Sequence, residues 1–441
     1  MIMYRKPQLR FFLVLAAFVA VSLAFSASAQ AAKVTSGGRY FIASQNAFIK
    51  ALFGVQHEFQ GGFTADLTSG EVWTLGKIFK AEVTPVPLYK VTAGAVGSAS
   101  VMSDVAAEAV SLIQEKDTVK KIRNFTPKAT VPWGVKKIYG DEKLKSTTGG
   151  KDVTVAVLDT GINAEHVDLV NRLADCKDFT RGATARSTCQ DQNGHGTHMA
   201  GIIAADGGWD GKGIWGVASE TNLLIYKVCR NDGTCWADDV AAGLLYAIQA
   251  KANIISLGLG GNDDIFLMKD AVNQAVKKNI LIVASAGNDG PLKGSIDWPA
   301  AYADVVAVGA LDEEGLVPDW SSRGVNDSDY IMESREIEFA APGVNIESIW
   351  SDGGYRFISG TSAAAPHVAG LAAKLWNGSA TSTRMLLQRS AQDMGLWGDD
   401  TATGFGLPQA PRITATESSS VDSAFFQSAS DQVMNVKEEI K

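Results

Sequence analysis

The sequence is poor in cysteine, proline and long apolar runs. Its 441 residues include 4 Cys and 12 Pro, so the chain is neither a small disulfide-stapled scaffold nor a proline-rich one. It also has no net positive charge: the formal net charge is −8, which gives nucleic-acid binding no electrostatic support. Hydrophobic residues make up 46% and charged residues 20%, which is typical of a globular protein with a large buried core.

The N-terminus has the pattern of an export signal. Residues 1–10 are basic, residues 11–25 are apolar, and Ala27-Ser28-Ala29 and Ala29-Gln30-Ala31 are small-x-small cleavage sites. This order is typical of secretory signals, and the apolar run is short for a membrane span. We predict that residues 1–31 are removed and that the protein is secreted, into the medium or the periplasm. A retained N-terminal anchor is the alternative; after signal removal we expect no membrane association.

Charge and composition then divide the chain. Residues 32–128 carry a charge of +3 and residues 129–441 carry −14, which indicates two units with complementary surfaces. In the first unit, residues 39–43 and 83–91 are strand-like, 93–103 read as a linker and 104–115 as a helix. The polar stretch 124–132 contains two prolines and marks a boundary. Residues 413–441 are rich in Ser, Glu and Lys and are expected to form a flexible tail.

Short apolar strands alternate with helices from residue 150 onward. Such strands, separated by helices, predict a parallel sheet buried on both faces. In this fold class ligands bind beyond the carboxyl ends of the strands. The expected strands are 153–158, 222–228, 252–257, 280–284 and 305–310, and the expected helices include 238–250 and 265–278.

The four cysteines form two close pairs in the sequence. Cys176 and Cys189 are 13 residues apart, and Cys229 and Cys235 are 6 apart. In an oxidising compartment, bridges within these pairs are the simplest of the three possible connectivities. Zinc binding is less favoured because the sequence has no paired CxxC motif.

Four polar residues stand where an acyl-transfer site would need them. Asp159 ends an apolar strand, His195 opens an apolar helical run between glycines, and Ser362 begins a helix of small residues. A serine hydroxyl needs a neutral imidazole to take its proton and a carboxylate to fix the imidazole tautomer. Asn288, in a glycine turn after a strand, could donate to the oxyanion, with the Ser362 N–H as second donor. Taken singly, each residue is as easily a turn or cap residue.

Together these segments resemble the subtilisin-like serine proteases, the subtilases. The motifs are Asp159-Thr160-Gly161, His195-Gly196-Thr197-His198-Met199-Ala200-Gly201, Ala286-Gly287-Asn288 and Gly360-Thr361-Ser362-Ala363-Ala364-Ala365-Pro366. They occur in the order Asp, His, Ser that subtilisin uses.

The resemblance implies a catalytic domain over 129–412 with a subtilisin-like α/β sheet. Asp159 would orient the imidazole, His195 would be general base and acid, Ser362 the nucleophile and Asn288 an oxyanion donor. The substrates would be polypeptides and the chemistry would need no cofactor. Ala363 stands where the family commonly has Met. His198 and His367 are expected to pack within their helices, and we expect a monomer.

The resemblance also places a substrate groove. The segment Ser256–Gly261 resembles the family stretch that pairs with substrate backbone, so Gly258, Leu259 and Gly260 are candidate substrate-binding residues, although Gly258 replaces a usual Ser. Residues 229–236 would form the facing edge, and an extended peptide would add as a strand between the two. Asp297 aligns near the pocket floor, where it would either pair with a Lys or Arg side chain at P1 or point to solvent.

Residues 32–128 resemble the family's propeptide, a small α+β domain that inhibits its own enzyme. The stretch Phe59–Ala65 through Val72 carries this likeness. The resemblance implies that the precursor cuts itself, and we predict a cut within 120–131.

A structural Ca²⁺ ion is a further implication. Asp168 matches a calcium-binding position of the family, and a full site needs six to eight oxygens. Asp206 and Asp210, in a glycine-rich loop, are possible contributors. The alternative is that Asp168 is a solvated surface carboxylate.

Other functions fit the residues less well. The second hypothesis is a catalytically dead subtilase fold that binds peptides or partners; all four groups are present, so the sequence gives no reason to prefer it. The Ser362 segment lacks the second glycine of the α/β-hydrolase elbow. His195 and His198 lack the glutamate and spacing of HExxH, and Gly258-x-Gly260 does not complete a dinucleotide motif.

Overall fold

The computed structural model describes residues 37–92, 125–182, 187–395 and 398–411. These fall into two compact units, which divide between Pro85 and Val86. The predicted signal (1–31), linker (93–103), helix (104–115) and tail (413–441) lie outside the described residues. Among the described residues, 37–92, 125–182, 187–395 and 398–411, no helix combines the length and the apolar character needed to cross a bilayer.

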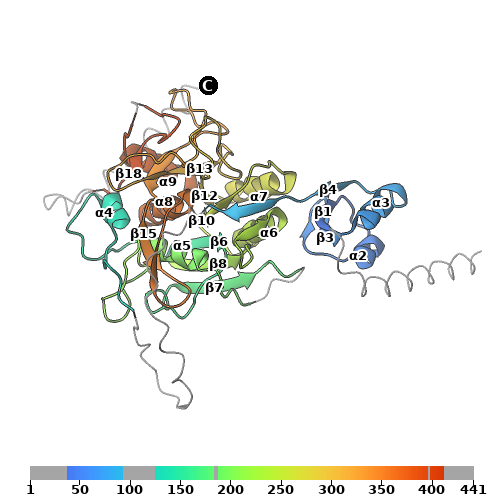
Figure 1. Ribbon diagram of the computed structural model, residues 1–441, viewed down its shortest axis with the longest axis horizontal. Helices are drawn as coiled ribbons and strands as arrows, with labels where there is room; N and C mark the ends of the chain where they lie inside the picture. Colours follow the sequence, from blue (N-terminus) through green and yellow to red (C-terminus); the bar gives the residue numbers. More distant parts are fainter. Residues whose placement is uncertain (1–36, 93–124, 183–186, 396–397, 412–441) are drawn as a thin grey trace, which may run out of the picture. The chain divides into compact units, whose positions relative to one another are not determined.

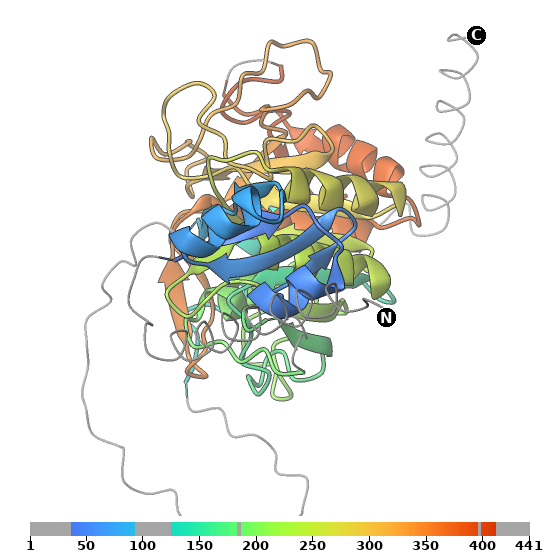
Figure 2. The same cartoon turned by 90° about the vertical axis from the view of Figure 1, so that its right-hand side faces the viewer.

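The smaller unit is an α+β body with an antiparallel sheet. Its strand order is β2-β3-β1-β4, and both helices cover the same face of the sheet, seen in blue in Figure 2. Apolar side chains at alternate positions of β3 point to that face and meet Leu75 of α3 and Ile49 of α2, which are buried. Its elements are β1 (Gly38–Ile42), α2 (Ala47–Phe53), β2 (Glu58–Phe59), β3 (Gly62–Leu67), α3 (Ser69–Lys77) and β4 (Val83–Pro85).

The larger unit is built on a seven-stranded parallel sheet, as predicted. The strand order is β14-β13-β12-β10-β6-β8-β7, and every pairing in it is parallel. Strand β6 is the first strand of this sheet along the chain, and later strands lie on both sides of it. The strand order therefore reverses direction at β6. The strands are β6 (Thr154–Asp159), β7 (Leu173–Asp178), β8 (Asn222–Lys227), β10 (Ile254–Leu257), β12 (Leu281–Ser285), β13 (Val305–Leu311) and β14 (Phe339–Pro342).

Helices cover both faces of this sheet, which confirms the predicted fold class. Figure 1 shows α5 and α8 on one side and α6 and α7 on the other. The two middle helices α5 and α8 are almost wholly buried, because small and apolar residues surround their axes. The helices are α4 (Trp133–Tyr139), α5 (His195–Ala204), α6 (Ala237–Gln249), α7 (Phe266–Lys277), α8 (Thr361–Leu375) and α9 (Ala380–Ser390).

Small antiparallel pairings complete the larger unit. One is a three-stranded sheet with β5 between β11 and β9. The strands are β5 (Leu88–Val91), β9 (Thr234–Trp236), β11 (Leu259–Gly260), β15 (Ile346–Ile349), β16 (Tyr355–Ile358), β17 (Ala391–Gln392) and β18 (Leu407–Pro408). Both predicted disulfides are present, Cys176–Cys189 and Cys229–Cys235, and no cysteine is free.

One predicted strand is wrong in its extent. The sequence suggested a single strand over 83–91, but the structure divides it into β4 and β5, which belong to different sheets. Pro85 and Pro87 flank the break, and neither has an N–H for a strand ladder. Strand β7 was not predicted, because its sequence Leu-Ala-Asp-Cys-Lys-Asp has no apolar pattern.

Candidate active site

The carboxyl end of β6 and the first residue of α5 bring Asp159 and His195 together. The His195 Nδ1 and Asp159 Oδ1 atoms are 2.7 Å apart, and both side chains are buried. A carboxylate can only accept, so Nδ1 carries the proton and Nε2 is left as the basic nitrogen. The Thr160 N–H also donates to Asp159 Oδ1, at 2.7 Å, which fixes the carboxylate's orientation.

Asp191 ties the start of α5 to the end of β6. Its carboxylate accepts from the backbone N–H groups of Gly194 at 2.8 Å and Thr197 at 2.9 Å, and from the Thr160 hydroxyl at 2.9 Å. A buried anion at this position satisfies N–H groups that have no partner within the helix and complements its dipole. The Thr160 hydroxyl in turn accepts from the Gly196 N–H at 2.9 Å. The position of His195 is therefore set from two sides.

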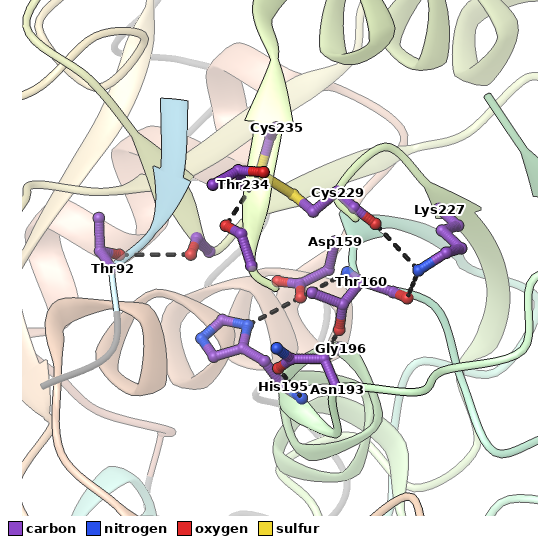
Figure 3. Close-up of a disulfide and its surroundings, with 12 residues drawn as sticks. Thr92, Asp159, Thr160, Asn193, His195, Gly196, Lys227, Cys229, Thr234 and Cys235 are labelled. Carbon is purple, nitrogen blue, oxygen red and sulfur yellow. Dashed lines mark hydrogen bonds and ion pairs between the residues drawn. A yellow bond between two sulfur atoms is a disulfide. The ribbon is translucent and has the colours of Figure 1, made fainter. Parts of the chain in front are cut away.

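The buried Lys227 and the Cys229–Cys235 disulfide lie near Asp159 (Figure 3). Lys227 donates to the carbonyl oxygens of Thr160 at 2.6 Å and Cys229 at 2.9 Å. Burial lowers the pKa of Lys227, and the nearby carboxylates, Asp191 foremost, oppose that effect. The Cys229–Cys235 bridge closes the loop that leads from β8 into β9.

Ser362 lies in the first turn of α8, a helix that packs against α5. Its Oγ and the His195 Nε2 are both buried, and neither has a hydrogen-bond partner among the described residues. Asn288 follows β12 in a turn opened by Gly287, whose φ of +107° favours glycine.

The orientation of the Asn288 amide is fixed by Thr361. The Asn288 Oδ1 accepts from the backbone N–H and from the hydroxyl of Thr361, both at 3.0 Å. Because both partners are donors, the carboxamide oxygen faces Thr361 and the NH₂ group faces the opposite side. That NH₂ group donates to the carbonyl oxygen of Thr92 at 2.7 Å. The backbone N–H of Ser362 donates to the same oxygen at 3.4 Å.

Strand β5 lies between the two segments that were predicted to be substrate edges. The backbones of Leu259 and Gly260 pair with one side of β5, and residues 234–236 pair with the other. Gly258 is close to the catalytic pair: a Cβ there would be 2.9 Å from Asp159 Oδ2 and 3.1 Å from His195 Cε1. A serine side chain at this position would therefore crowd the imidazole.

Asp297 is buried, so the alternative that it points to solvent is wrong. It is 5% exposed, and its Oδ2 would lie 3.0 Å and 2.7 Å from a Cβ placed on Gly260 and on Gly287. Burial, with a contribution from the charge of Asp289, raises the pKa of Asp297 to about 7. Its Oδ1 has no hydrogen-bond partner among the described residues. A carboxyl group whose pKa is near neutral pH therefore lies beside β11, the strand that pairs with β5.

The two neighbouring histidines are structural. His198 donates from Nε2 to the carbonyl oxygens of Ile346 at 3.0 Å and Arg356 at 3.1 Å, which ties α5 to the β15–β16 hairpin. Burial lowers the pKa of His198 to about 3 and that of His367 to about 4. Both rings therefore stay neutral at physiological pH and pack within the core.

Asp168 is buried, so the alternative of a solvated surface carboxylate is wrong. Its Oδ2 accepts from the Ile214 N–H at 3.0 Å and from the Tyr355 hydroxyl at 2.8 Å. Burial raises the pKa of Asp206, and the charge of Asp168 adds to the rise. Within the described ranges, no group of three His, Cys, Asp or Glu ligands surrounds Asp168.

Sequence reasoning missed several residues of the site. Thr92, Asp191, Lys227 and Thr361 were not assigned roles. Two carried a local signal: Asp191 is an acidic residue four positions before His195, the first residue of α5, and Thr361 adjoins the serine in its motif. The roles of Thr92 and Lys227 depend on contacts with distant segments and have no local signal.

Comparisons with known proteins all point to the same protein family. A profile of the subtilase family matches residues 150–406. A subtilisin from Bacillus sp. (strain TA39) is 40% identical over 383 residues, covering 81% of this chain and 86% of that protein. The major intracellular serine protease of Bacillus subtilis (strain 168) is 39% identical over 245 residues, covering 54% of this chain and 73% of that protein.

Solved structures agree. Sphericase is 44% identical with a TM-score of 0.63, and the S41 psychrophilic protease is 42% identical with a TM-score of 0.62. Each match covers 65% of this chain and all of the solved chain. The chain therefore belongs to the subtilase family and is a subtilisin-like serine endopeptidase.

Proposed function

We propose that the chain is a secreted endopeptidase that hydrolyses peptide bonds through Ser362, His195 and Asp159. The observation that supports this most is the convergence of three features: the 2.7 Å contact of His195 with Asp159, a buried serine hydroxyl without a partner among the described residues, and two donors aimed at one carbonyl oxygen.

In this mechanism the Ser362 Oγ attacks the substrate carbonyl carbon while His195 Nε2 takes its proton. The Asn288 amide and the Ser362 N–H hold the oxyanion. His195 then passes the proton to the leaving amine, and water hydrolyses the acyl-enzyme by the reverse roles. Asp159 keeps the imidazole in the required tautomer throughout. No step needs a cofactor.

A fluorophosphonate probe tests this proposal, because only an activated serine reacts with it. We expect labelling of the wild type and none of Ser362→Ala, with loss of activity on a peptide substrate. His195→Ala should retain its fold, by circular dichroism, and lose labelling. Because β5 lies between the two edges, the probe is applied after limited proteolysis has removed the segment that contains β5. If the wild type is then folded and unlabelled, the chain is instead a peptide-binding subtilase fold.

We further propose that cleavage prefers Lys or Arg at P1. Asp297 is the support, because its carboxylate lies against Gly260 and Gly287, beside the strand that pairs with β5. A buried acid can pair with a guanidinium or an ammonium group. Comparison of peptides with P1 Arg and P1 Phe tests the preference, and a strong preference for Phe would refute it.

The protein is proposed to be made as an inhibited precursor with a signal peptide at 1–31 and a propeptide beginning at 32. The match to the strain TA39 subtilisin covers more of this chain than residues 129–441 could supply, so the likeness extends into the N-terminal part. N-terminal sequencing of protein from the culture medium tests signal removal, and gel filtration tests the expected monomer.

A structural calcium ion at Asp168 is the remaining proposal. The support is that the charge of the buried Asp168 adds to the raised pKa of the half-buried Asp206. Arg172 pairs with Asp206 at 3.3 Å, and a cation beside Asp168 would further relieve the repulsion between the two acids. Asp168 and carbonyl oxygens of the loop after α5 would hold the ion. If so, a chelator lowers the melting temperature of the wild type and not that of Asp168→Asn; identical wild-type curves with and without chelator would exclude the site.

A further inference from the structure

The chain places one of its own peptide bonds in the position of a substrate. Strand β5 is antiparallel to both neighbours, with Gly260 opposite Lys90 and Cys235 opposite Tyr89. Its pairing continues past the strand end: the Val91 N–H donates to the Gly233 oxygen and the Thr92 N–H to the Gly258 oxygen, each at 3.0 Å. Main-chain bonds on both sides are what strand addition of a peptide requires.

Thr92 stands where the scissile carbonyl would be, at P1. A bond that its own chain already holds in place does not need the basic P1 side chain proposed for separate substrates. Its carbonyl oxygen accepts from Asn288 Nδ2 and from the Ser362 N–H, the two donors proposed for the oxyanion. Its hydroxyl donates to Ser285 Oγ at 2.7 Å, at the end of β12. Thr92 is 7% exposed, so the bond lies in a site largely screened from water.

The register is fixed by Tyr89, three residues earlier. The Tyr89 side chain is fully buried, packs where a Cβ on Gly261 would be 2.4 Å from its ring, and donates its hydroxyl to the Asp263 carbonyl at 2.7 Å. A slip of one residue would turn this ring to the other face of the strand and expose it. The strand therefore presents the Thr92 carbonyl and no neighbouring one.

Residues 128–130, which belong to the predicted cleavage window 120–131, are bonded to other parts of the larger unit. The backbone N–H groups of Lys128 and Ala129 donate to the Glu347 carboxylate, at 2.6 Å and 3.1 Å. The Thr130 oxygen accepts from the Trp215 N–H at 2.8 Å. These bonds would have to break before residues 128–130 could enter the groove that β5 fills.

We infer that the peptide bond between Thr92 and Ala93 is the first bond that the precursor cuts, and that residues 93–128 stay attached to the catalytic unit at that stage. The inference rests on the proposed function and moves the first cut away from 120–131. Any cut there comes later.

The chemistry balances within the chain. The Ser362 Oγ bonds to the Thr92 carbonyl carbon and its proton passes to His195 Nε2. The bond from that carbon to the Ala93 nitrogen breaks, and the nitrogen leaves as an amine with the proton from His195. Water then adds to the ester, Ser362 regains its proton, and Thr92 ends as a carboxylate still paired between β9 and β11, as a product-like inhibitor.

The test is a time course of refolding of the full-length precursor, followed by intact mass and N-terminal sequencing. We expect the first fragments to end at Thr92 and begin at Ala93, and Ser362→Ala to yield neither. Asn288→Ala should slow the same cut about 100-fold or more, the cost of one oxyanion donor. First fragments with ends within 120–131 would overturn the inference.

A matched pair of variants addresses the bond itself. Ala93→Pro turns the secondary amide of the scissile bond into a tertiary amide and should block the cut, whereas Ala95→Pro, two residues on, should leave its rate within a factor of two or three. If Ala93→Pro does not fold, the wild-type fragment masses still decide. Fluorophosphonate labelling after limited proteolysis has removed the segment that contains β5 separates the two proposals: a labelled serine with a first cut elsewhere refutes only the bond, and a folded chain that never cuts itself and stays unlabelled after this removal refutes both.

Discussion

The buried acid Asp297 gives a sharp prediction about pH and specificity. With a pKa of about 7, its carboxyl is roughly 10% ionised at pH 6 and 90% ionised at pH 8. If only the ionised form pairs with a basic P1 side chain, the ratio of kcat/KM for Arg over Phe substrates should rise about tenfold over that interval. The ratio cancels pH effects on the catalytic steps that the two substrates share, because both need the same catalytic residues.

Asp297→Asn is the matched control, since it keeps the size of the side chain and removes the charge. In this variant the ratio should be low and should not change with pH. The assignment of Asp297 to the P1 pocket would be refuted if the Arg-to-Phe ratio of kcat/KM in the wild type did not change from pH 6 to pH 8. It would also be refuted if the ratio in Asp297→Asn rose with pH as it does in the wild type.

Stability measurements test the same pKa independently. The folded-state pKa lies above the ordinary value of 3.8, so the folded protein holds this proton more tightly than the unfolded chain does. The stability contribution is present at acidic pH and is lost as pH rises from about 4 to about 7. Between pH 5 and pH 9 the wild type should lose about 3 kcal/mol relative to Asp297→Asn. Urea unfolding in a Ser362→Ala background avoids autolysis, and parallel curves for the two proteins would show that Asp297 does not titrate in this range.

Three further predictions concern residues that position the site. Thr361→Val removes the hydroxyl that donates to the Asn288 oxygen and leaves the backbone N–H donor in place. We expect kcat to fall about tenfold with little change in KM, and Thr361→Ser to restore it. An unchanged kcat would mean that Thr361 does not fix the orientation of the Asn288 amide. Replacing Cys229 and Cys235 together by Ser frees the loop before β9 and should raise KM more than it lowers kcat, measured by steady-state kinetics; a pure loss of kcat would place the bridge's effect on the catalytic pair instead. Asp191→Ala leaves buried N–H groups of α5 unpaired and should cost about 3 kcal/mol in urea unfolding, and a loss below about 0.5 kcal/mol would mean that water replaces the carboxylate.

Much of the architecture follows from local pattern alone. Short apolar strands separated by helices specify a parallel sheet, because each strand must bury both faces. The sequence also identified the four candidate catalytic residues, since Asp159, His195, Asn288 and Ser362 stand in motifs specific enough to name a family. The disulfide pairing was predictable for a similar reason, because two close pairs of cysteines in an exported chain favour local bridges.

Other features depend on contacts that no local pattern encodes. Residues 83–91 look like one strand, yet β4 pairs with β1 and β5 pairs with β9 and β11; strand propensity does not specify a partner. For the same reason no local pattern indicated that the Asn288 amide and the Ser362 N–H both donate to the Thr92 carbonyl oxygen.

The environment of each polar group was likewise decided by the fold. Asp297 was equally compatible with solvent or a pocket, and Asp168 with a surface position; both are buried. A carboxyl side chain has the same covalent structure in either place. Its pKa and its partners come from the neighbours that folding brings to it from distant parts of the chain, which is why motifs pointed to a reaction while only the tertiary structure decided the environment of each acid.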